Sequence, residues 1–207
     1  MKKQHIIFDM DGTLSNTAIA TEAAIRMVEK QHDIPYVSLA DVHGAMGLGG
    51  LEFHKKLFPT LPMETLLAVE KAVDAIEDEN IASIGTAILF TGVYDMLAKL
   101  RSQGHTLYIA STGSAPHVET TLTAGNIKDM FAQIHCDQPQ KKDMVREIIA
   151  GGDPSNWVMV GDMFKDSEAA RANNITAIGA AFGYLAKGDY ELFDHILQTP
   201  EDIFAYV

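Results

Sequence analysis

The chain has 207 residues, a length that allows one domain, or one domain with a small insertion. Its 16 basic and 28 acidic side chains give a formal net charge of −12, which disfavours nucleic acid polymers and anionic membrane surfaces as partners. The chain has a single cysteine, which excludes an intrachain disulfide. No apolar run approaches the length of about 18 residues that a membrane span needs. We therefore expect a cytoplasmic protein without a signal peptide.

The predicted elements change character along the chain. An apolar run at residues 5–8, bounded by turn residues, is typical of a buried strand. Residues 16–83 carry apolar side chains at helical spacing throughout, with no convincing strand. Strands and helices then alternate. We expect strands at 106–110, 132–136, 157–160 and 176–178, and helices at 93–103, 115–124, 142–149 and 166–172.

This alternation predicts an α/β fold: a Rossmann-like, doubly wound parallel sheet with helices on both faces. The first strand precedes the helical stretch and the other strands follow it, so the stretch is an insertion into the sheet domain. We expect the α/β core domain to comprise residues 1–15 and 85–207, and the inserted helical domain, called the cap below, to comprise residues 16–84. Neither part is basic, since residues 15–88 alone carry 11 acidic and five basic side chains.

Polar side chains follow four of the predicted strands, where ligands of open parallel sheets bind. They are Asp9 and Asp11, then Ser111 and Thr112, then Lys141 and Lys142, and finally Asp162 and Asp166. Several carboxylates brought together need a cation, and Mg²⁺ prefers carboxylates, water and a substrate phosphate as ligands. The pattern therefore indicates Mg²⁺-dependent phosphoryl transfer.

Four short motifs resemble those of the haloacid dehalogenase (HAD) superfamily, in its aspartyl phosphatase branch. They occur in the family's order and cover essentially the whole chain. Within the superfamily, the chain resembles the phosphoglycolate phosphatase-like enzymes, which carry a small helical cap after the first motif. The motifs are FDMDGTL at residues 8–14, the serine of YIASTG at 108–113, the lysine of KKDMV at 141–145 and GDMFKD at 161–166.

The resemblance implies the chemical roles. Asp9 would be the nucleophile that forms an aspartyl-phosphate, and Asp11 would protonate the leaving oxygen and later activate water. Mg²⁺ would be held by Asp9, the Asp11 carbonyl oxygen and Asp162, with Asp166 bound directly or through water.

The resemblance also implies the phosphate contacts. Ser111, Thr112 and the Gly113 amide would hold the phosphoryl oxygens. Lys141 would neutralise developing charge and keep the nucleophile ionised. Its spacing to the acidic and apolar residues that follow favours Lys141, and Lys142, one residue further on, remains the alternative.

Within the family, the second aspartate of the first motif, Asp11, favours phosphate esters over halides and phosphonates. We expect hydrolysis of a small-molecule phosphate monoester, such as a phosphoglycolate-like compound, a sugar phosphate or a nucleotide, by a monomer or homodimer. A phosphotransferase or mutase of the β-phosphoglucomutase type is the alternative, although Gly50 stands where those enzymes carry an arginine. A non-catalytic binding protein on the same fold is a third hypothesis.

Few residues of the cap indicate which substrate it would recognise. The loop at residues 47–50 is either a closing segment or a plain helix–helix turn, and Lys55 and Lys56 are either solvated or readers of a second anionic group. Arg26 is a similarly weak candidate. We interpret the eight histidines as surface or structural residues, and Cys136 as part of the core.

Overall fold

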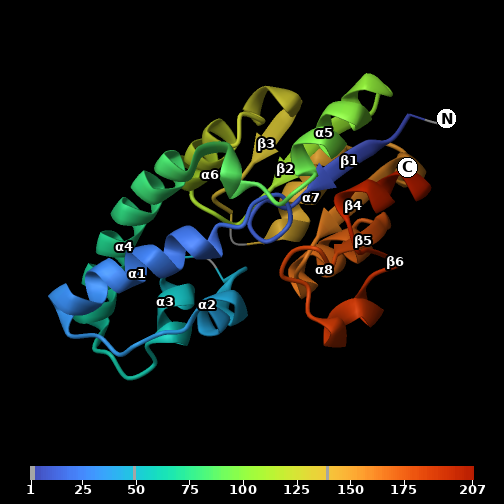
Figure 1. Ribbon diagram of the computed structural model, residues 1–207. Helices are drawn as coiled ribbons and strands as arrows, with labels where there is room; N and C mark the ends of the chain where they lie inside the picture. Colours follow the sequence, from blue (N-terminus) through green and yellow to red (C-terminus); the bar gives the residue numbers. More distant parts are fainter. Residues whose placement is uncertain (1–2, 49, 139) are drawn as a thin grey trace.

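The computed structural model describes residues 3–48, 50–138 and 140–207 (Figure 1). Its six strands form one parallel sheet in the order β3-β2-β1-β4-β5-β6, which confirms the α/β prediction. The strands are β1 (His5–Phe8), β2 (Thr106–Ala110), β3 (Gln133–His135), β4 (Trp157–Gly161), β5 (Thr176–Ala180) and β6 (His195–Leu197).

Eight α-helices of the described residues divide between an insertion after β1 and the flanks of the sheet. The insertion holds the cap helices, α1 (Ala18–His32), α2 (Leu39–Ala45), α3 (Leu51–Leu57) and α4 (Met63–Ile84). The sheet is flanked by α5 (Val93–Ser102), α6 (Ala115–Ala124), α7 (Lys141–Ile149) and α8 (Phe164–Ala172).

The central strand β1 is apolar on both sides because helices cover both faces of the sheet. Ile6 and Phe8 point into the layer that α5 helps to form, whereas Ile7 points into the layer shared with α7 and α8. All three side chains are fully buried. This two-sided burial explains why the strand reads as a continuous apolar run rather than as an alternating one.

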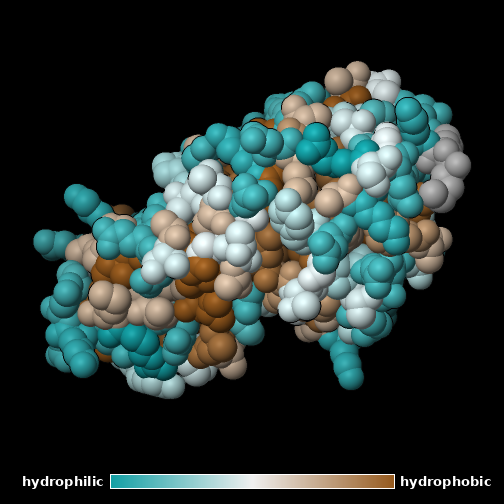
Figure 2. Space-filling view, turned by 45° about the horizontal axis from the view of Figure 1, so that its top comes forward, coloured by the Kyte–Doolittle hydropathy of each residue, from teal (hydrophilic) through white to brown (hydrophobic). Residues whose placement is uncertain are grey.

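The cap helices pack around an apolar cluster of their own, which includes Ile25, Val28, Phe58 and Val69. Figure 1 shows them gathered beside the sheet, with the long helix α4 running toward α6. Most of the exposed large hydrophobic side chains of the described residues lie in the cap, and Figure 2 shows hydrophobic surface on that lobe. None of the described helices combines the length and hydropathy of a transmembrane span.

The chain enters and leaves the cap at one place. The Asn16 backbone N–H donates to the Ile88 carbonyl at 2.7 Å, and the Phe90 N–H donates to the Leu14 carbonyl at 3.0 Å. The two connecting segments therefore run side by side, and they hold the cap helices against the edge of the sheet where β1 ends.

The expected elements correspond to the structure with small shifts at their ends, and α7 begins at Lys141 rather than at 142. Strand β6 was not anticipated from the sequence. Cys136 follows β3 and is partly buried, packed against the edge of the core cluster rather than enclosed in it.

Candidate active site

The first motif forms a tight loop at the carboxyl end of β1. The backbone N–H of Asp9 donates to the Val160 carbonyl of the neighbouring β4 at 2.9 Å. The backbone N–H groups of Leu14 and Ser15 both donate to the Met10 carbonyl. The loop needs glycine at position 12, where φ is +83°. A Cβ on Gly12 would also lie 2.5 Å from the Asp162 carboxylate, so the glycine lets the first and fourth motifs meet.

Three carboxylates converge where β1 and β4 end. Asp9, Asp162 and Asp166 can each offer an oxygen within 4.8 Å of the others, and all three are buried. The Thr13 hydroxyl donates to Asp162 Oδ1 at 2.7 Å, but the buried Oδ2 has no hydrogen-bond partner among the described residues. Burial, together with the neighbouring charges of Asp9 and Asp166, raises the pKa of Asp162 well above its usual range. These are the oxygen ligands that a divalent cation requires.

Lys141 supplies the positive charge of this cluster. Its Nζ lies 2.7 Å from Asp9 Oδ1 and 2.6 Å from Asp166 Oδ1. Burial alone would lower the lysine pKa, but the two carboxylates outweigh it and raise the pKa above the usual value. Lys142 is only partly buried, so the structure brings Lys141, and not its neighbour, to the first aspartate.

Asp166 is fixed from two sides. Besides the lysine, its carboxylate accepts the backbone N–H groups of Asp162 at 3.1 Å and Met163 at 2.9 Å, at the start of α8. Gly161 makes room for it, since a Cβ there would lie 2.1 Å from the Asp166 Cγ. The close approach of the Asp166 carboxylate to Gly161 explains why the fourth motif has a glycine five residues before this aspartate.

The second motif follows β2. The Ser111 backbone N–H donates to His135 of β3 at 3.0 Å, and the buried hydroxyl accepts from the Gly113 N–H at 3.1 Å. A cavity of about 150 Å³ opens here, between the ends of the strands and the cap helices. The predicted site residues that line it are Asp9, Asp11, Ser111, Thr112 and Gly113.

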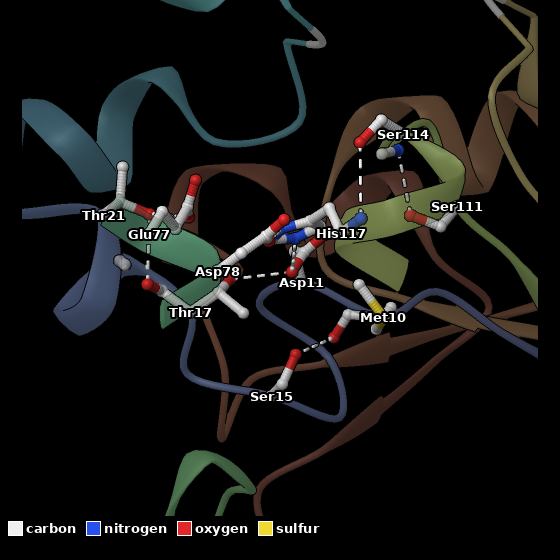
Figure 3. A network of polar contacts seen from close by, with 12 residues as sticks. Met10, Asp11, Ser15, Thr17, Thr21, Glu77, Asp78, Ser111, Ser114 and His117 are labelled. Atoms are coloured by element: carbon white, nitrogen blue, oxygen red, sulfur yellow. Dashed lines mark hydrogen bonds and ion pairs between the residues drawn. The ribbon is translucent and has the colours of Figure 1, made fainter. Parts of the chain in front are cut away.

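Asp11 points toward Thr17 and His117 (Figure 3). Its Oδ1 accepts from the Thr17 hydroxyl at 2.8 Å and lies 3.0 Å from His117 Nε2 on α6. The other ring nitrogen of His117 lies 3.7 Å from Asp78 on α4. Burial would raise the pKa of Asp11, but the imidazole and the hydroxyl lower it overall, while Asp11 and the acidic side chains of α4 raise the pKa of His117.

Two further contacts join the cap to the sheet near the cavity. Lys165 Nζ donates to the Gly47 carbonyl at 2.7 Å, and the Tyr184 ring stacks on His43 of α2 with centroids 4.4 Å apart. Gly47 and Gly50 both line the cavity, whereas Gly49 of the same loop lies outside the described residues. The described residues of this loop therefore form part of the cavity wall.

The basic candidates of the cap point elsewhere. Lys55 pairs with Glu52 at 2.8 Å, and Arg26 pairs with Glu22 and Glu29. Among the described residues that line the cavity there is no lysine or arginine.

Several cavity residues were not among the predicted site residues. The interpretation of the histidines as surface or structural is wrong for His117, which lies in the site, and His54 also lines the cavity. No spacing marks either residue. The acidic side chains of α4 had a readable signal, because residues at i, i+3 and i+4 share a helix face. They are Asp74, Glu77 and Asp78.

The fold and the site can be compared with known proteins. Residues 6–180 match the family described as haloacid dehalogenase-like hydrolase. Phosphoglycolate phosphatase of Synechococcus elongatus is 30% identical over 125 residues, which cover 58% of this chain and 59% of that protein. The Caulobacter vibrioides phosphoglycolate phosphatase is 28% identical over 195 residues, 86% of this chain and 79% of that protein.

Solved structures share the fold over nearly the whole chain. One described as a predicted phosphoglycolate phosphatase from Haemophilus somnus has a TM-score of 0.89 at 22% identity, and the match covers 99% of this chain and 98% of that one. The β-phosphoglucomutase of Clostridium difficile has a TM-score of 0.79 at 16% identity, with 99% and 95% covered.

Proposed function

The chain belongs to the haloacid dehalogenase-like hydrolase family, and from this premise we propose that it is a Mg²⁺-dependent phosphatase that hydrolyses a small-molecule phosphate monoester through an aspartyl-phosphate on Asp9. Family membership and the phosphoglycolate phosphatase relatives support a hydrolase that acts on phosphate esters. The observation that carries the proposal is the buried cluster in which Lys141 bridges Asp9 and Asp166 beside the unpartnered oxygen of Asp162.

The donor set fits Mg²⁺. Asp9, Asp162 and the Asp11 carbonyl oxygen would hold the ion, and Asp166 would support it directly or through water. The Asp166 carboxylate already accepts from Lys141 and from two backbone N–H groups, which favours the supporting position. When bound, the ion supplies positive charge that offsets the charge of the phosphate and of the carboxylates.

The residues of the chain divide the chemistry between them. An oxygen of Asp9 forms a bond to phosphorus while the ester oxygen leaves, and Asp11 passes that oxygen a proton, which the adjacent His117 imidazole, whose pKa is raised, supplies. Asp11 then takes a proton from the water that attacks the aspartyl-phosphate, which releases inorganic phosphate and restores Asp9. Lys141 favours the ionised nucleophile against burial, which raises the pKa of Asp9 to about 7. Lys141 also stabilises charge on the phosphoryl oxygens, which Ser111, Thr112 and Gly113 hold from the other side.

The cap has a matching part in this proposal. Residues 16–84 close the cavity over the substrate, and residues 1–15 and 85–207 hold the phosphate. Closure excludes water and brings the leaving group against the cap helices. His117, held between Asp11 and Asp78, joins the two parts at the acid–base residue.

A transferase of the β-phosphoglucomutase type receives no support from the cavity. Its described lining offers no lysine or arginine for a second phosphate, and Gly50 has no side chain. The likeness to β-phosphoglucomutase, at 16% identity, concerns the fold.

The test is hydrolysis of a panel of phosphate monoesters by the full chain with Mg²⁺. We expect release of inorganic phosphate that is abolished in Asp9→Asn and retained in Asp129→Asn, a control at an exposed aspartate. No hydrolysis of any ester would contradict the proposal, and full activity of Asp9→Asn would contradict the assigned nucleophile. Release of an isomer instead of phosphate would favour the mutase.

A further inference from the structure

We infer that the cap side of the cavity selects a small phosphate monoester whose leaving alcohol carries an ammonium group, and that it disfavours one with a carboxylate or a second phosphate. The inference rests on the proposed function and names its substrate class. It comes from the charges, the unpaired acceptor and the size of the cavity.

The two walls of the cavity differ in their side chains. The sheet side presents the nucleophile and the hydroxyl and amide groups of residues 111–114, which suit a phosphoryl group. The cap side presents three carboxylates from one face of α4, Asp74, Glu77 and Asp78, beside the apolar side chains of Phe53 and Val73. With no lysine or arginine among the described lining residues, a second anion would meet like charge there.

One imidazole does not balance the three carboxylates. His117 lies between Asp11 and Asp78, so its charge is shared by a pair of carboxylates. Glu77 receives a hydrogen bond from the neutral Thr21 hydroxyl. Burial raises the pKa of Glu77 to about 7, as expected for a carboxylate that lacks a full countercharge. An ammonium group in the cavity would supply the missing positive charge.

His54 adds an acceptor without a donor. The side chain is 2% exposed and lines the cavity, and its Nδ1 lies 3.4 Å from the Gly50 carbonyl. Burial lowers its pKa, so the ring is neutral and donates from Nδ1 to that carbonyl. Its buried Nε2 is then a bare acceptor, with no hydrogen-bond partner among the described residues. An N–H or O–H group of a ligand seated against this side chain would satisfy Nε2, whereas a carboxylate oxygen would not.

A second metal ion is a poorer occupant. Within the described part of the chain, the compact acidic group is Asp9, Asp162 and Asp166, and the carboxylates of α4 form no comparable cluster. The volume of the cavity also limits the size of the leaving group. The cavity is about 150 Å³, the volume of an engineered cavity that holds benzene, so it suits a leaving group with a backbone of about two or three carbons rather than a nucleoside.

The experiment compares three esters of nearly equal size: 2-aminoethyl phosphate, 2-hydroxyethyl phosphate and carboxymethyl phosphate, which is 2-phosphoglycolate. The full chain is assayed with Mg²⁺, with p-nitrophenyl phosphate as a reference. We expect kcat/KM for the aminoethyl ester to exceed that for the carboxymethyl ester by about tenfold or more, the effect of one charge-assisted contact. The hydroxyethyl ester falls between them.

Variants on α4 assign the preference to its charges. Glu77→Gln should reduce the aminoethyl-to-carboxymethyl ratio by about fivefold or more, because it removes one charge that attracts the ammonium. Asp74→Asn, at a more exposed position, provides the same comparison if the first variant does not fold. Glu79→Gln is the matched control, an exposed carboxylate of the same helix outside the cavity lining, and it should leave the ratio unchanged.

Two results would overturn the inference. One is a carboxymethyl ester hydrolysed as fast as the aminoethyl ester, and the other is a ratio that neither α4 variant changes. In both cases turnover of p-nitrophenyl phosphate leaves the phosphatase proposal intact. If no ester is hydrolysed, including the reference, the proposed function fails and the inference fails with it.

Discussion

Both walls of the cavity present carboxylates, but within the described residues only those on the sheet side have a lysine as a partner. On the sheet side, Lys141 bridges Asp9 and Asp166, and backbone N–H groups hold the latter. On the cap side, Glu77 and Asp74 have no lysine or arginine beside them in the described cavity lining. In the proposed function the sheet side would hold the phosphoryl group and the cation, whatever the leaving group. The unbalanced negative charge of the cap side would then be met by a positive charge on the ligand.

The supports of the two walls differ as well. The sheet-side residues follow strands whose register is fixed by parallel pairing on both sides. The cap is held by two adjacent connecting segments, by the packing of α4 against α6 and by contacts such as Lys165 to Gly47 and Tyr184 to His43. The sheet side is therefore positioned by strand pairing, which suits bond-breaking chemistry, whereas the cap side is positioned by helix packing.

The largest effect is expected from removing the charge balance of the sheet side. Lys141→Met leaves two buried carboxylates without their cation, and breaking such a buried pair costs about 3–5 kcal/mol of unfolding free energy. Urea denaturation at neutral pH measures it. Lys142→Met, on the partly buried neighbour, is the control, and equal losses in the two variants would contradict the difference drawn between the two lysines.

Metal removal tests the same side more gently. We expect Mg²⁺ to raise the melting temperature of the chain because it relieves repulsion among Asp9, Asp162 and Asp166. At about a hundredfold excess over Kd the gain would be about 2.7 kcal/mol. Calorimetry with and without a chelator provides the measurement. Asp162→Asn should reduce the gain, and an undiminished gain in that variant would place the ion elsewhere.

The junction between the walls is expected to show an intermediate effect. His117→Ala removes the group that holds Asp11 and faces Asp78, so kcat should fall by about tenfold to a hundredfold as acid–base catalysis weakens. Steady-state kinetics on p-nitrophenyl phosphate provides the measurement, with His32→Ala in α1 as a control outside the cavity lining. Unchanged kcat would show that the contact is not needed for catalysis.

A further effect concerns the cap carboxylate itself. Because burial raises the pKa of Glu77 from 4.5 to about 7, the folded protein holds this proton more tightly than the unfolded chain. The contribution of Glu77 to stability is therefore fully present below about pH 4.5 and is lost as the pH rises to about 7. Glu77→Gln should gain stability relative to wild type across this window. Denaturation midpoints at pH 4.5 and 8 would show it, and a constant difference would contradict it.

The sequence could predict the sheet side because its residues follow apolar strands in a recognisable order. Asp9, Ser111 and Asp162 lie where strand ends of a parallel sheet must meet, whatever the detail of packing. The choice between Lys141 and Lys142 needed the structure, since one residue at the start of α7 decides which side chain faces inward.

The cap side could not be predicted to the same extent. His54 and His117 enter the cavity through the packing of the cap helices against each other and of α4 against α6, which no local pattern encodes. The acidic face of α4 was visible in the spacing, but a solvated helix face has the same pattern. The boundaries of the cap at residues 16–84 and the roles of the site residues remain predictions.

The central claim is that Asp9 carries the phosphoryl group during turnover. The most direct measurement is rapid acid quenching of the chain with Mg²⁺ and a hydrolysed ester, followed by mass spectrometry of the peptide that contains residues 8–14. We predict that this peptide gains one phosphoryl group on Asp9 within a single turnover, and that Asp9→Asn gains none. Turnover without a phosphorylated peptide, or with the phosphoryl group on another residue, would contradict the account.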